Sequence, residues 1–202
     1  MITLRVLKRF ADKIQSGCPW VMRHEAVESS EWMTLAPGEL VRVEAERGGF
    51  IGIGMANPHS HIVCRMLTQR DEKIDEAFFA ARLSRALAKR EGFYDAPYYR
   101  LVHAEADVLP GLIIDRFGGV MVAQVGSAGM ERLQHLWLAA LEKIMPYSAL
   151  VLRNDFSSRK LEGLEQFVRV ERGEIKGPII VRENGCAYFA DLLEGQKTGW
   201  FY

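Results

Sequence analysis

The sequence predicts an α+β protein with a small N-terminal β-barrel followed by a compact α+β central domain. Residues 1–70 contain short alternating apolar and polar runs, separated by Pro, Gly and Asn turns and with little helical periodicity. Residues 71–192 combine two amphipathic helical segments with several strand-like runs. The chain has 202 residues and is 49% hydrophobic, which is enough to bury the core of one or two globular domains.

The barrel is predicted from four or five short strands. ITLRVLK at 2–8 alternates as a half-buried strand should, and PWVMRHEAVES at 19–29 follows a Gly-Cys-Pro break. Residues 36–58 predict a Pro-Gly turn, a strand, a Gly-Gly hairpin turn, a second strand and an Asn-Pro stop. HIVCRMLT at 61–68 completes the set. Short strands joined by tight turns, with little helix, favour a small barrel.

The central domain is predicted to begin after the charged segment DEKID at 71–75. Asp75 can cap a helix that starts at Glu76, and Gly92 can end it. The residues that share one face of this helix are Phe79, Leu83, Ala86, Leu87 and Arg90. A second amphipathic helix is predicted over 130–145. The predicted strands are 98–103, 111–117, 120–126 and 149–153, with two or three more between 167 and 192.

The charge of the chain is balanced overall but uneven locally. Lys and Arg number 26, as do Asp and Glu, which argues against a strongly basic nucleic-acid-binding protein. Residues 1–23 nevertheless contain only one acidic residue, Asp12, among several cations. The cations are Arg5, Lys8, Arg9, Lys13 and Arg23. Such a cluster can be a local footprint on RNA or simply a solvated surface.

Compartment signals point to the cytoplasm. No apolar run approaches the roughly 18 residues of a membrane span, and the N-terminus has no signal-peptide pattern. Cys18, Cys64 and Cys186 are odd in number and far apart, as expected of reduced thiols.

Three short motifs fail as ligand-binding signatures. GQKTG at 195–199 lacks the first glycine of a phosphate-binding loop, so it is either a turn or a ligand-facing loop. GFIGIGMAN at 49–57 lacks the strand–turn–helix context of a dinucleotide site. HSHIVC at 59–64 offers no fourth ligand, so no metal site is assigned.

Carboxylates and arginines cluster around two loops of the central domain. Glu105, Asp107 and Asp115 bracket a Leu-Pro-Gly turn, where they can act as acid and base or satisfy backbone N–H groups. RNDFSSRK at 153–160 carries arginines that can pair with these carboxylates or grip phosphate. No nucleophile elbow or activated cysteine is found, so no catalytic residue is assigned.

Taken together, these segments resemble the bacterial family of S-adenosylmethionine-dependent large-subunit rRNA cytosine-5 methyltransferases of the methyltransferase I type. The matching pieces are PW at 19–20, PGELV at 37–41, GIGMANPHSHIVCRMLT at 52–68, YRLVHAEADVLPGLIIDRFG at 99–118, EGL at 162–164 and GQKTGWF at 195–201. The resemblance implies a PUA RNA-binding barrel at 1–70, the central domain at 71–192 and, from 193–202 onward, the start of a Rossmann-like methyltransferase domain.

The resemblance also implies roles for particular residues. RNA-binding residues are expected to be Arg5, Lys8, Arg9, Lys13, Arg23, His24 and Arg65. The wall of the active-site cleft is expected to include Glu105, Asp107, Arg153 and Asn154. Residues near S-adenosylmethionine in the intact enzyme are expected to be Gln196, Lys197, Thr198 and Gly199.

The expected function is the RNA-binding and central portion of an rRNA methyltransferase. The glycine-rich cofactor turn and a nucleophilic cysteine belong to the third domain, so this chain is expected to bind no cofactor and to be inactive alone. A stand-alone PUA-type RNA-binding adaptor is the alternative. A dimerisation module that pairs through Trp200, Phe201 and Tyr202 is a third possibility, since an apolar tail favours self-association.

Overall fold

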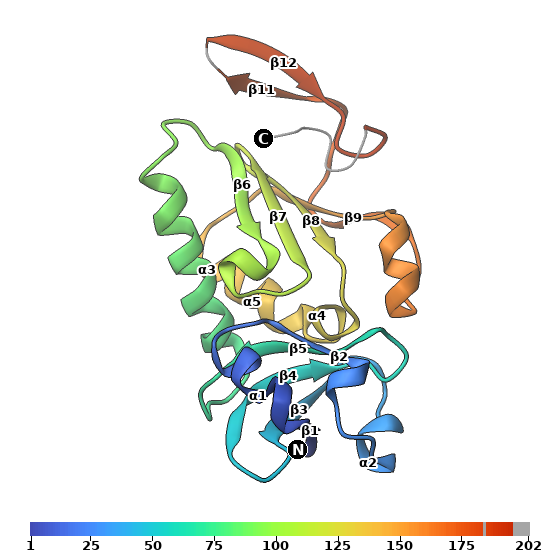
Figure 1. Ribbon diagram of the computed structural model, residues 1–202. Coiled ribbons are helices and arrows are strands. Elements are labelled where there is room, and N and C mark those ends of the chain that lie inside the picture. The colour runs from blue at the N-terminus through green and yellow to red at the C-terminus, as the bar shows by residue number, and fades with distance from the viewer. Residues whose placement is uncertain (184, 196–202) are drawn as a thin grey trace.

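The computed structural model describes residues 1–183 and 185–195 of the chain. These residues form two five-stranded sheets and one two-stranded hairpin, which follow one another along the molecule (Figure 1). Helices pack beside both larger sheets. The predicted α+β class, with strands first and mixed helix and sheet afterwards, is confirmed.

The first sheet has the strand order β1-β3-β4-β5-β2. Its strands are β1 (Ile2–Val6), β2 (Trp20–Met22), β3 (Glu39–Ala45), β4 (Phe50–Ala56) and β5 (Ile62–Thr68). β1 pairs with β3 in parallel, and the other pairs are antiparallel. An antiparallel bridge joins Val6 to Ala26, and the N–H of Val27 donates to the carbonyl of Arg5 at 2.7 Å. The chain that follows β2 thus meets β1 and closes the barrel, as predicted.

The expectation of little helix in the first 70 residues is wrong. Helix α1 (Lys8–Gln15) buries only Ala11 and Ile14, and the four-residue helix α2 (Ser30–Met33) is capped by the Ser29 hydroxyl. A 3₁₀ turn, η1, spans Arg23–Glu25. Phe10, Ala11 and Ile14 share one side of α1, but the helix has only eight residues and directly follows the alternating run of β1, which dominates the pattern.

The second sheet has the order β10-β9-β8-β7-β6. Its strands are β6 (Tyr98–His103), β7 (Leu112–Phe117), β8 (Val120–Val125), β9 (Ala149–Asn154) and β10 (Phe167–Arg172). β8 and β9 are parallel and all other neighbours are antiparallel. A parallel pair needs a long crossover connection, and helices α4 (Ala128–Arg132) and α5 (Gln134–Ile144) provide it.

The helix predicted over 130–145 is two helices rather than one. The Ser127 hydroxyl accepts from the N–H of Met130 and starts α4 two residues early, and Leu133 separates α4 from α5. The helix predicted from Glu76 is confirmed as α3 (Glu76–Glu91), where the Asp75 carboxylate accepts from the N–H of Phe78.

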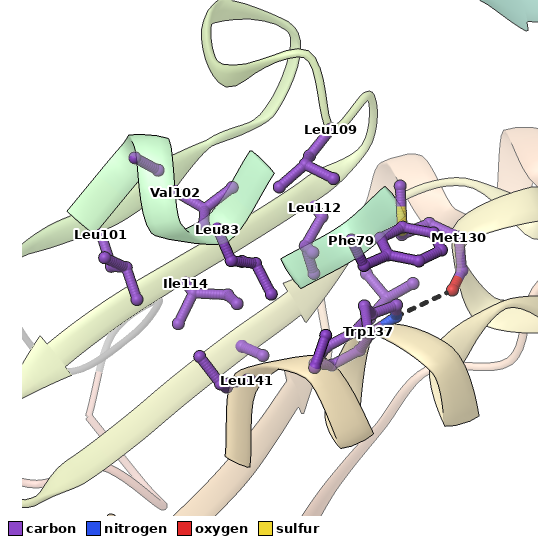
Figure 2. Packing of buried hydrophobic residues seen from close by; sticks show 14 of the residues in the cluster. Phe79, Leu83, Leu101, Val102, Leu109, Leu112, Ile114, Met130, Trp137 and Leu141 are labelled. Atoms are coloured by element: carbon purple, nitrogen blue, oxygen red, sulfur yellow. Dashed lines mark hydrogen bonds between the residues drawn. The ribbon is translucent and has the colours of Figure 1, made fainter. Parts of the chain in front are cut away.

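Helices α3 and α5 cover one face of the second sheet (Figure 2). Phe79 and Leu83 of α3 meet Leu112 and Ile114 of β7, and all four side chains are buried. The indole N–H of Trp137 in α5 donates to the carbonyl of Met130 at 3.1 Å. This cluster is the core of the central domain.

The other face of the sheet packs against a hairpin of β11 (Ile179–Glu183) and β12 (Cys186–Ala190). Val122 and Val151 project to this face, because side chains alternate along their strands, and they pack against Val181 and Leu192. The predicted strands between 167 and 192 are therefore β10, β11 and β12.

Two glycines allow the barrel and the central domain to approach closely. A Cβ atom on Gly38, which has a positive φ of 87°, would lie 2.5 Å from the carbonyl oxygen of Ala128. A Cβ atom on Gly129 would lie 2.3 Å from the Cβ of Met55 in β4. No larger residue fits either position without moving backbone.

Two 3₁₀ turns, η2 (Ala104–Asp107) and η3 (Ser157–Glu162), complete the described elements. Across the two described ranges, no helix combines the length and the apolar character needed to cross a bilayer.

Candidate RNA-binding site

The cations predicted to bind RNA surround helix α1. Those with exposed side chains are Arg5, Lys8, Arg9, Lys13, Arg23 and His24. Arg5 lies on β1, the next three residues lie on α1, and the last two lie in η1. The structure thus brings six of the seven predicted residues to neighbouring elements of the barrel, and they are exposed as an RNA contact requires.

Two of these cations already have partners within the barrel. The ammonium of Lys13 forms an ion pair with the carboxylate of Glu25, which is buried. Burial alone would raise the pKa of Glu25, but the hydrogen bonds from Lys13 and from the N–H of Met22 outweigh it and lower the pKa. The guanidinium of Arg23 donates to the carbonyl of Pro58. The charge of Lys13 is therefore offset within the barrel, whereas Arg23 keeps its full charge and has one N–H group occupied.

An aromatic ring lies among these cations. The guanidinium of Arg9 lies 4.8 Å from the ring centroid of Phe10, and the ring of His24 packs edge-on against Phe10 at 5.6 Å. This packing positions Arg9 and His24 beside each other on the surface.

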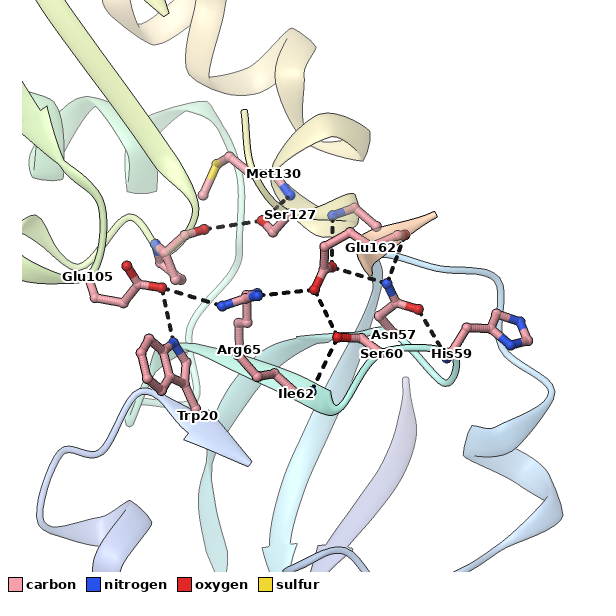
Figure 3. Close-up of polar contacts among 12 residues, drawn as sticks. Trp20, Asn57, His59, Ser60, Ile62, Arg65, Glu105, Ser127, Met130 and Glu162 are labelled. Carbon is pink, nitrogen blue, oxygen red and sulfur yellow. Dashed lines mark hydrogen bonds and ion pairs between the residues drawn. The ribbon is translucent and has the colours of Figure 1, made fainter. Parts of the chain in front are cut away.

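The seventh predicted residue, Arg65 on β5, lies at the junction of the two domains (Figure 3). One terminal nitrogen, Nη2, lies 3.0 Å from Oε1 of Glu162, and the other, Nη1, lies 3.5 Å from Oε1 of Glu105. Only 14% of the Arg65 side chain is exposed. The structure therefore separates Arg65 from the α1 group and pairs it with two carboxylates of the central domain.

Glu162 is the centre of that junction, and the sequence analysis assigned it no role. Its buried carboxylate accepts from the Asn57 amide at 3.0 Å, from the Ser60 hydroxyl at 3.0 Å and from the N–H of Ala128 at 3.3 Å, besides Arg65 (Figure 3). Three of the four donors belong to the turn between β4 and β5 or to β5 itself. The carboxylate thus fixes the barrel to the central domain.

Glu105, predicted for the cleft, also contacts the barrel. Its carboxylate accepts from the indole N–H of Trp20 at 3.0 Å. It lines a cavity of about 620 Å³ between the domains, whose walls include Cys18 and Pro19 from the barrel and Arg82 and Arg85 from α3. Of the four residues predicted for the cleft, Glu105 is the one that lines this cavity.

Asp107 is buried and serves the loop that carries it. Its carboxylate accepts two hydrogen bonds from Arg90, at 2.8 and 2.6 Å, and one from the N–H of His103 at 2.8 Å. Burial would raise the pKa of Asp107, but these donors more than compensate and lower it. The next residue, Val108, has a φ of 60°, a conformation that β-branched residues rarely adopt. Asp115 is likewise buried and paired, with Arg100 at 2.9 Å.

Arg153 and Asn154 lie at the end of β9, and both are buried. The guanidinium of Arg153 donates to the carbonyls of Leu192 at 3.0 Å and Gly195 at 2.6 Å. The Asn154 side-chain oxygen accepts from a β8 N–H at 2.8 Å, while its amide nitrogen has no partner among the described residues. Arg153 thus holds the segment that leads directly to the predicted cofactor loop.

The predicted cofactor residues themselves, Gln196, Lys197, Thr198 and Gly199, lie outside the described residues. The same holds for Trp200, Phe201 and Tyr202, so self-association through them stays a prediction.

The described residues contain no cluster that could hold a metal ion, and Cys64 is not an activated thiol. Within residues 1–183 and 185–195, no group of three or more His, Cys, Asp or Glu side chains could hold a metal ion. Burial raises the pKa of the Cys64 thiol to about 12, so it is not a thiolate at neutral pH.

Known proteins resemble this chain both in its N-terminal barrel and over most of its length. Residues 4–69 match the model of a PUA-like domain. The chain is 35% identical over 188 residues to ribosomal RNA large subunit methyltransferase I of Pseudoalteromonas atlantica, and this covers 91% of the chain and 47% of the relative. The protein of the same name from Shewanella amazonensis is 39% identical over 169 residues, covering 81% of the chain and 43% of the relative.

Solved structures share the fold over the whole chain. SMU.776, described as a candidate methyltransferase complexed with SAH, superposes with a TM-score of 0.81 at 17% identity, over 100% of this chain and 50% of that one. A protein from Streptococcus mutans, described as a candidate SAM-dependent methyltransferase, gives a TM-score of 0.80 at 18% identity, over 100% and 51%. At these identities the likeness concerns the fold alone.

The chain spans about half the length of the curated relatives it matches. Its PUA-like barrel and its matches over 91% of its residues agree with the resemblance found in the sequence. Over 91% of its residues the chain is therefore a homologue of part of the ribosomal RNA large subunit methyltransferase I proteins.

Proposed function

We propose that this chain is the RNA-binding and central portion of an S-adenosylmethionine-dependent enzyme that methylates C5 of a cytosine in large-subunit rRNA. The observation that carries the proposal is the set of exposed cations around α1, on a barrel that matches the PUA-like domain model. The chain would bind the RNA in the cytoplasm, and the chemistry would belong to the part of these relatives that the chain does not cover.

The chain's own residues support a binding role rather than a chemical one. Arg5, Lys8 and Arg9 are exposed, and their charged groups form no ion pair in the described part of the chain, although the Glu46 carboxylate accepts from the backbone N–H of Lys8 at 3.1 Å. Their charges are available to phosphates, which provide most of the affinity in nucleic-acid binding. The proposal assigns the base-modifying step to none of these residues.

The cofactor part of the proposal concerns the segment after Gly195. Arg153 binds the carbonyls of Leu192 and Gly195, and the carboxylate of Asp191 accepts from the N–H groups of Leu193 and Glu194, both at 2.9 Å. A segment fixed in this way could present Gln196 to Gly199 to S-adenosylmethionine in the intact enzyme. The cofactor would supply the methyl group, and Arg153 would act by positioning the segment.

The RNA-binding test is the double variant Lys8→Ala/Arg9→Ala. We expect weaker binding to fluorescently labelled rRNA fragments, and a plot of log K against log salt whose slope is shallower by about 1.4 to 1.8. The matched control is Arg47→Ala/Arg182→Ala, since both side chains are exposed and have no hydrogen bond or ion pair among the described residues. Equal slopes for the two double variants would show that the α1 surface does not contact RNA.

The catalytic test uses a tritiated methyl donor and undermethylated 23S rRNA. The 202-residue chain is expected to give no incorporation above a blank, whereas a relative of twice its length is expected to label cytosine C5. Incorporation by the 202-residue chain would refute the assignment of chemistry to other residues, and a label on another base would refute the C5 assignment.

A further inference from the structure

Helix α3 carries a line of cations that the proposed function does not use. Arg82, Arg85 and Lys89 are three and four residues apart, so they lie along one side of the helix. Glu91 is nine positions from Arg82, half a turn out of phase, and therefore lies on the opposite side. The helix runs beside the central sheet, with its first turn next to the barrel (Figure 1).

The barrel end of this line opens on the interdomain cavity. Arg70 from the barrel and Arg82 and Arg85 from α3 line the same space of about 620 Å³. Arg70 and Arg85 are exposed, and their side chains have no hydrogen bond or ion pair within the described ranges. Three guanidinium groups at one cavity form a site for an anion.

The two carboxylates that line the cavity, Glu72 and Glu105, form no ion pair with these arginines among the described residues. Glu72 accepts from the Thr68 hydroxyl at 2.5 Å. Glu105 is bonded to Trp20 at 3.0 Å and paired with Arg65 at 3.5 Å. The cavity therefore keeps an excess of positive charge.

Arg82 is held in place as a fixed element of this site. It donates from Nε to the carbonyl of Val108 at 3.2 Å and from Nη2 to that of Leu67 at 2.8 Å, and it lies 3.5 Å from the ring centroid of Phe78. Burial lowers the pKa of Arg82 to about 10, although Glu72 raises it, and the charges of Arg85 and Arg70 lower it further. The group is still charged at neutral pH, and a bound anion would offset its repulsion from the other arginines.

The far end of the line carries exposed aromatic rings. Phe93 is 86% exposed and Tyr94 is 47% exposed, and together with Lys89 and Arg90 they line a second, smaller hollow. Both cations are paired with the Asp107 carboxylate, Arg90 at 2.6 Å and the more exposed Lys89 at 3.6 Å. The Tyr94 ring packs 5.2 Å from that of Tyr99, which fixes its orientation. An exposed ring beside a cation is a platform on which an unpaired base can stack.

We propose that α3 and the interdomain cavity form a second RNA-binding surface. It binds a single-stranded segment, with one phosphate in the cavity and one base stacked on Phe93. The surface from Arg82 to Phe93 is about 16 Å long, from a helical rise of about 1.5 Å per residue. A single strand is the expected partner because stacking on a side chain requires an unpaired base. The inference rests on the proposed function, since it extends the same RNA from the barrel onto the central domain.

The test compares Arg70→Ala/Arg85→Ala with the control Arg47→Ala/Arg182→Ala in the full 202-residue chain. Both remove two exposed arginines, so the net charge changes equally. Binding of a labelled single-stranded rRNA segment is measured by fluorescence anisotropy between 50 and 200 mM KCl. The slope of log K against log salt is expected to fall by about 0.7 for the cavity variant, the value for the one phosphate held in the cavity, and to stay unchanged for the control.

A third variant, Phe93→Ala, separates stacking from charge. It is expected to weaken binding about 5- to 150-fold without changing the salt slope, since stacking involves no counterion release. Thermal unfolding of each variant checks that the chain is folded.

The outcomes distinguish this inference from the proposed function. If Lys8→Ala/Arg9→Ala lowers the salt slope but Arg70→Ala/Arg85→Ala and Phe93→Ala behave as the control, RNA binds the barrel only and the second surface is refuted. If the unaltered chain does not bind RNA, both proposals fail together. A duplex bound as tightly as the single strand, with no effect of Phe93→Ala, would also refute the second surface.

Discussion

Replacing Glu162 with alanine is expected to destabilise the protein by about 3 kcal/mol. Removing one partner of a buried ion pair costs about 3–5 kcal/mol, because the other charge is left without compensation. Here Arg65 keeps Glu105 at 3.5 Å and is 14% exposed, which favours the lower end of that range. The Asn57 amide and the Ser60 hydroxyl also lose their acceptor, so the loss of stability is not expected to be smaller than the lower end of that range.

The measurement is urea unfolding, followed by far-UV circular dichroism and tryptophan fluorescence. Trp32 lies in the core of the barrel and Trp137 in the core of the central domain, so fluorescence reports on both. Since Glu162 joins the two domains, its loss is also expected to reduce cooperativity, seen as a smaller m-value or two separate transitions. The control is Glu165→Ala, an exposed carboxylate three residues away, expected to lie within about 0.5 kcal/mol of the unaltered chain.

A result at odds with this account would be a Glu162→Ala variant that unfolds within about 1 kcal/mol of the unaltered chain, in a single transition with the same m-value. A double-mutant cycle with Ser60→Ala adds a second check. Residues in one hydrogen-bond network usually couple by about 0.5–3 kcal/mol, so simple additivity would show that the 3.0 Å contact contributes no stability.

Three further substitutions, all in the central domain, are expected to change stability or susceptibility to proteolysis. Asp107→Asn is expected to lower the free energy of unfolding at pH 7 and to make that free energy depend less on pH in acid. Because the pKa of Asp107 is lowered in the folded state, the carboxylate contributes its full stability above about pH 4 and loses it as the pH falls through the lowered pKa. Unfolding measured between about pH 2 and 7 checks this. Val108→Asn is expected to stabilise the chain by about 1 kcal/mol, because asparagine tolerates the φ of 60° better than valine, and an unchanged or lower melting temperature would contradict this. Arg153→Met leaves the carbonyls of Leu192 and Gly195 without their hydrogen-bond donor. Limited proteolysis is therefore expected to cleave the segment that follows Asp191 about ten times faster than in the unaltered chain. Equal cleavage rates would mean that Arg153 does not hold the segment.

The sequence predicted the elements whose signals are local. Helix α3 was placed from the Asp75 cap and an apolar face, and Phe79 and Leu83 of that face are buried as expected. The hairpin of β3 and β4 followed from the glycine pair between them. In each case a few neighbouring residues determine the conformation.

Features that depend on distant residues could not be predicted in this way. Helix α1 has an apolar side of only three residues, Phe10, Ala11 and Ile14, and an eight-residue helix of this kind is stable only because that side packs on the barrel. The role of Glu162 depends on Asn57 and Ser60, which are more than 100 residues away. Arg82, Arg85 and Lys89 recur at helical spacing, and this signal in the sequence is enough to predict a basic side of α3.

The tight seam at Gly38 and Gly129 limits how the two domains can turn relative to each other. With Glu162 bonded across the same seam, the barrel cannot swing without breaking backbone packing and a buried charge pair. An RNA segment bound to the barrel would then lie at a fixed distance from the end of the central domain. In an enzyme that modifies a single nucleotide of a long RNA, a fixed arrangement of the two domains would set the distance along the RNA between the bound segment and the modified nucleotide. A larger residue at either glycine would then change which nucleotide is modified before it changed the reaction rate.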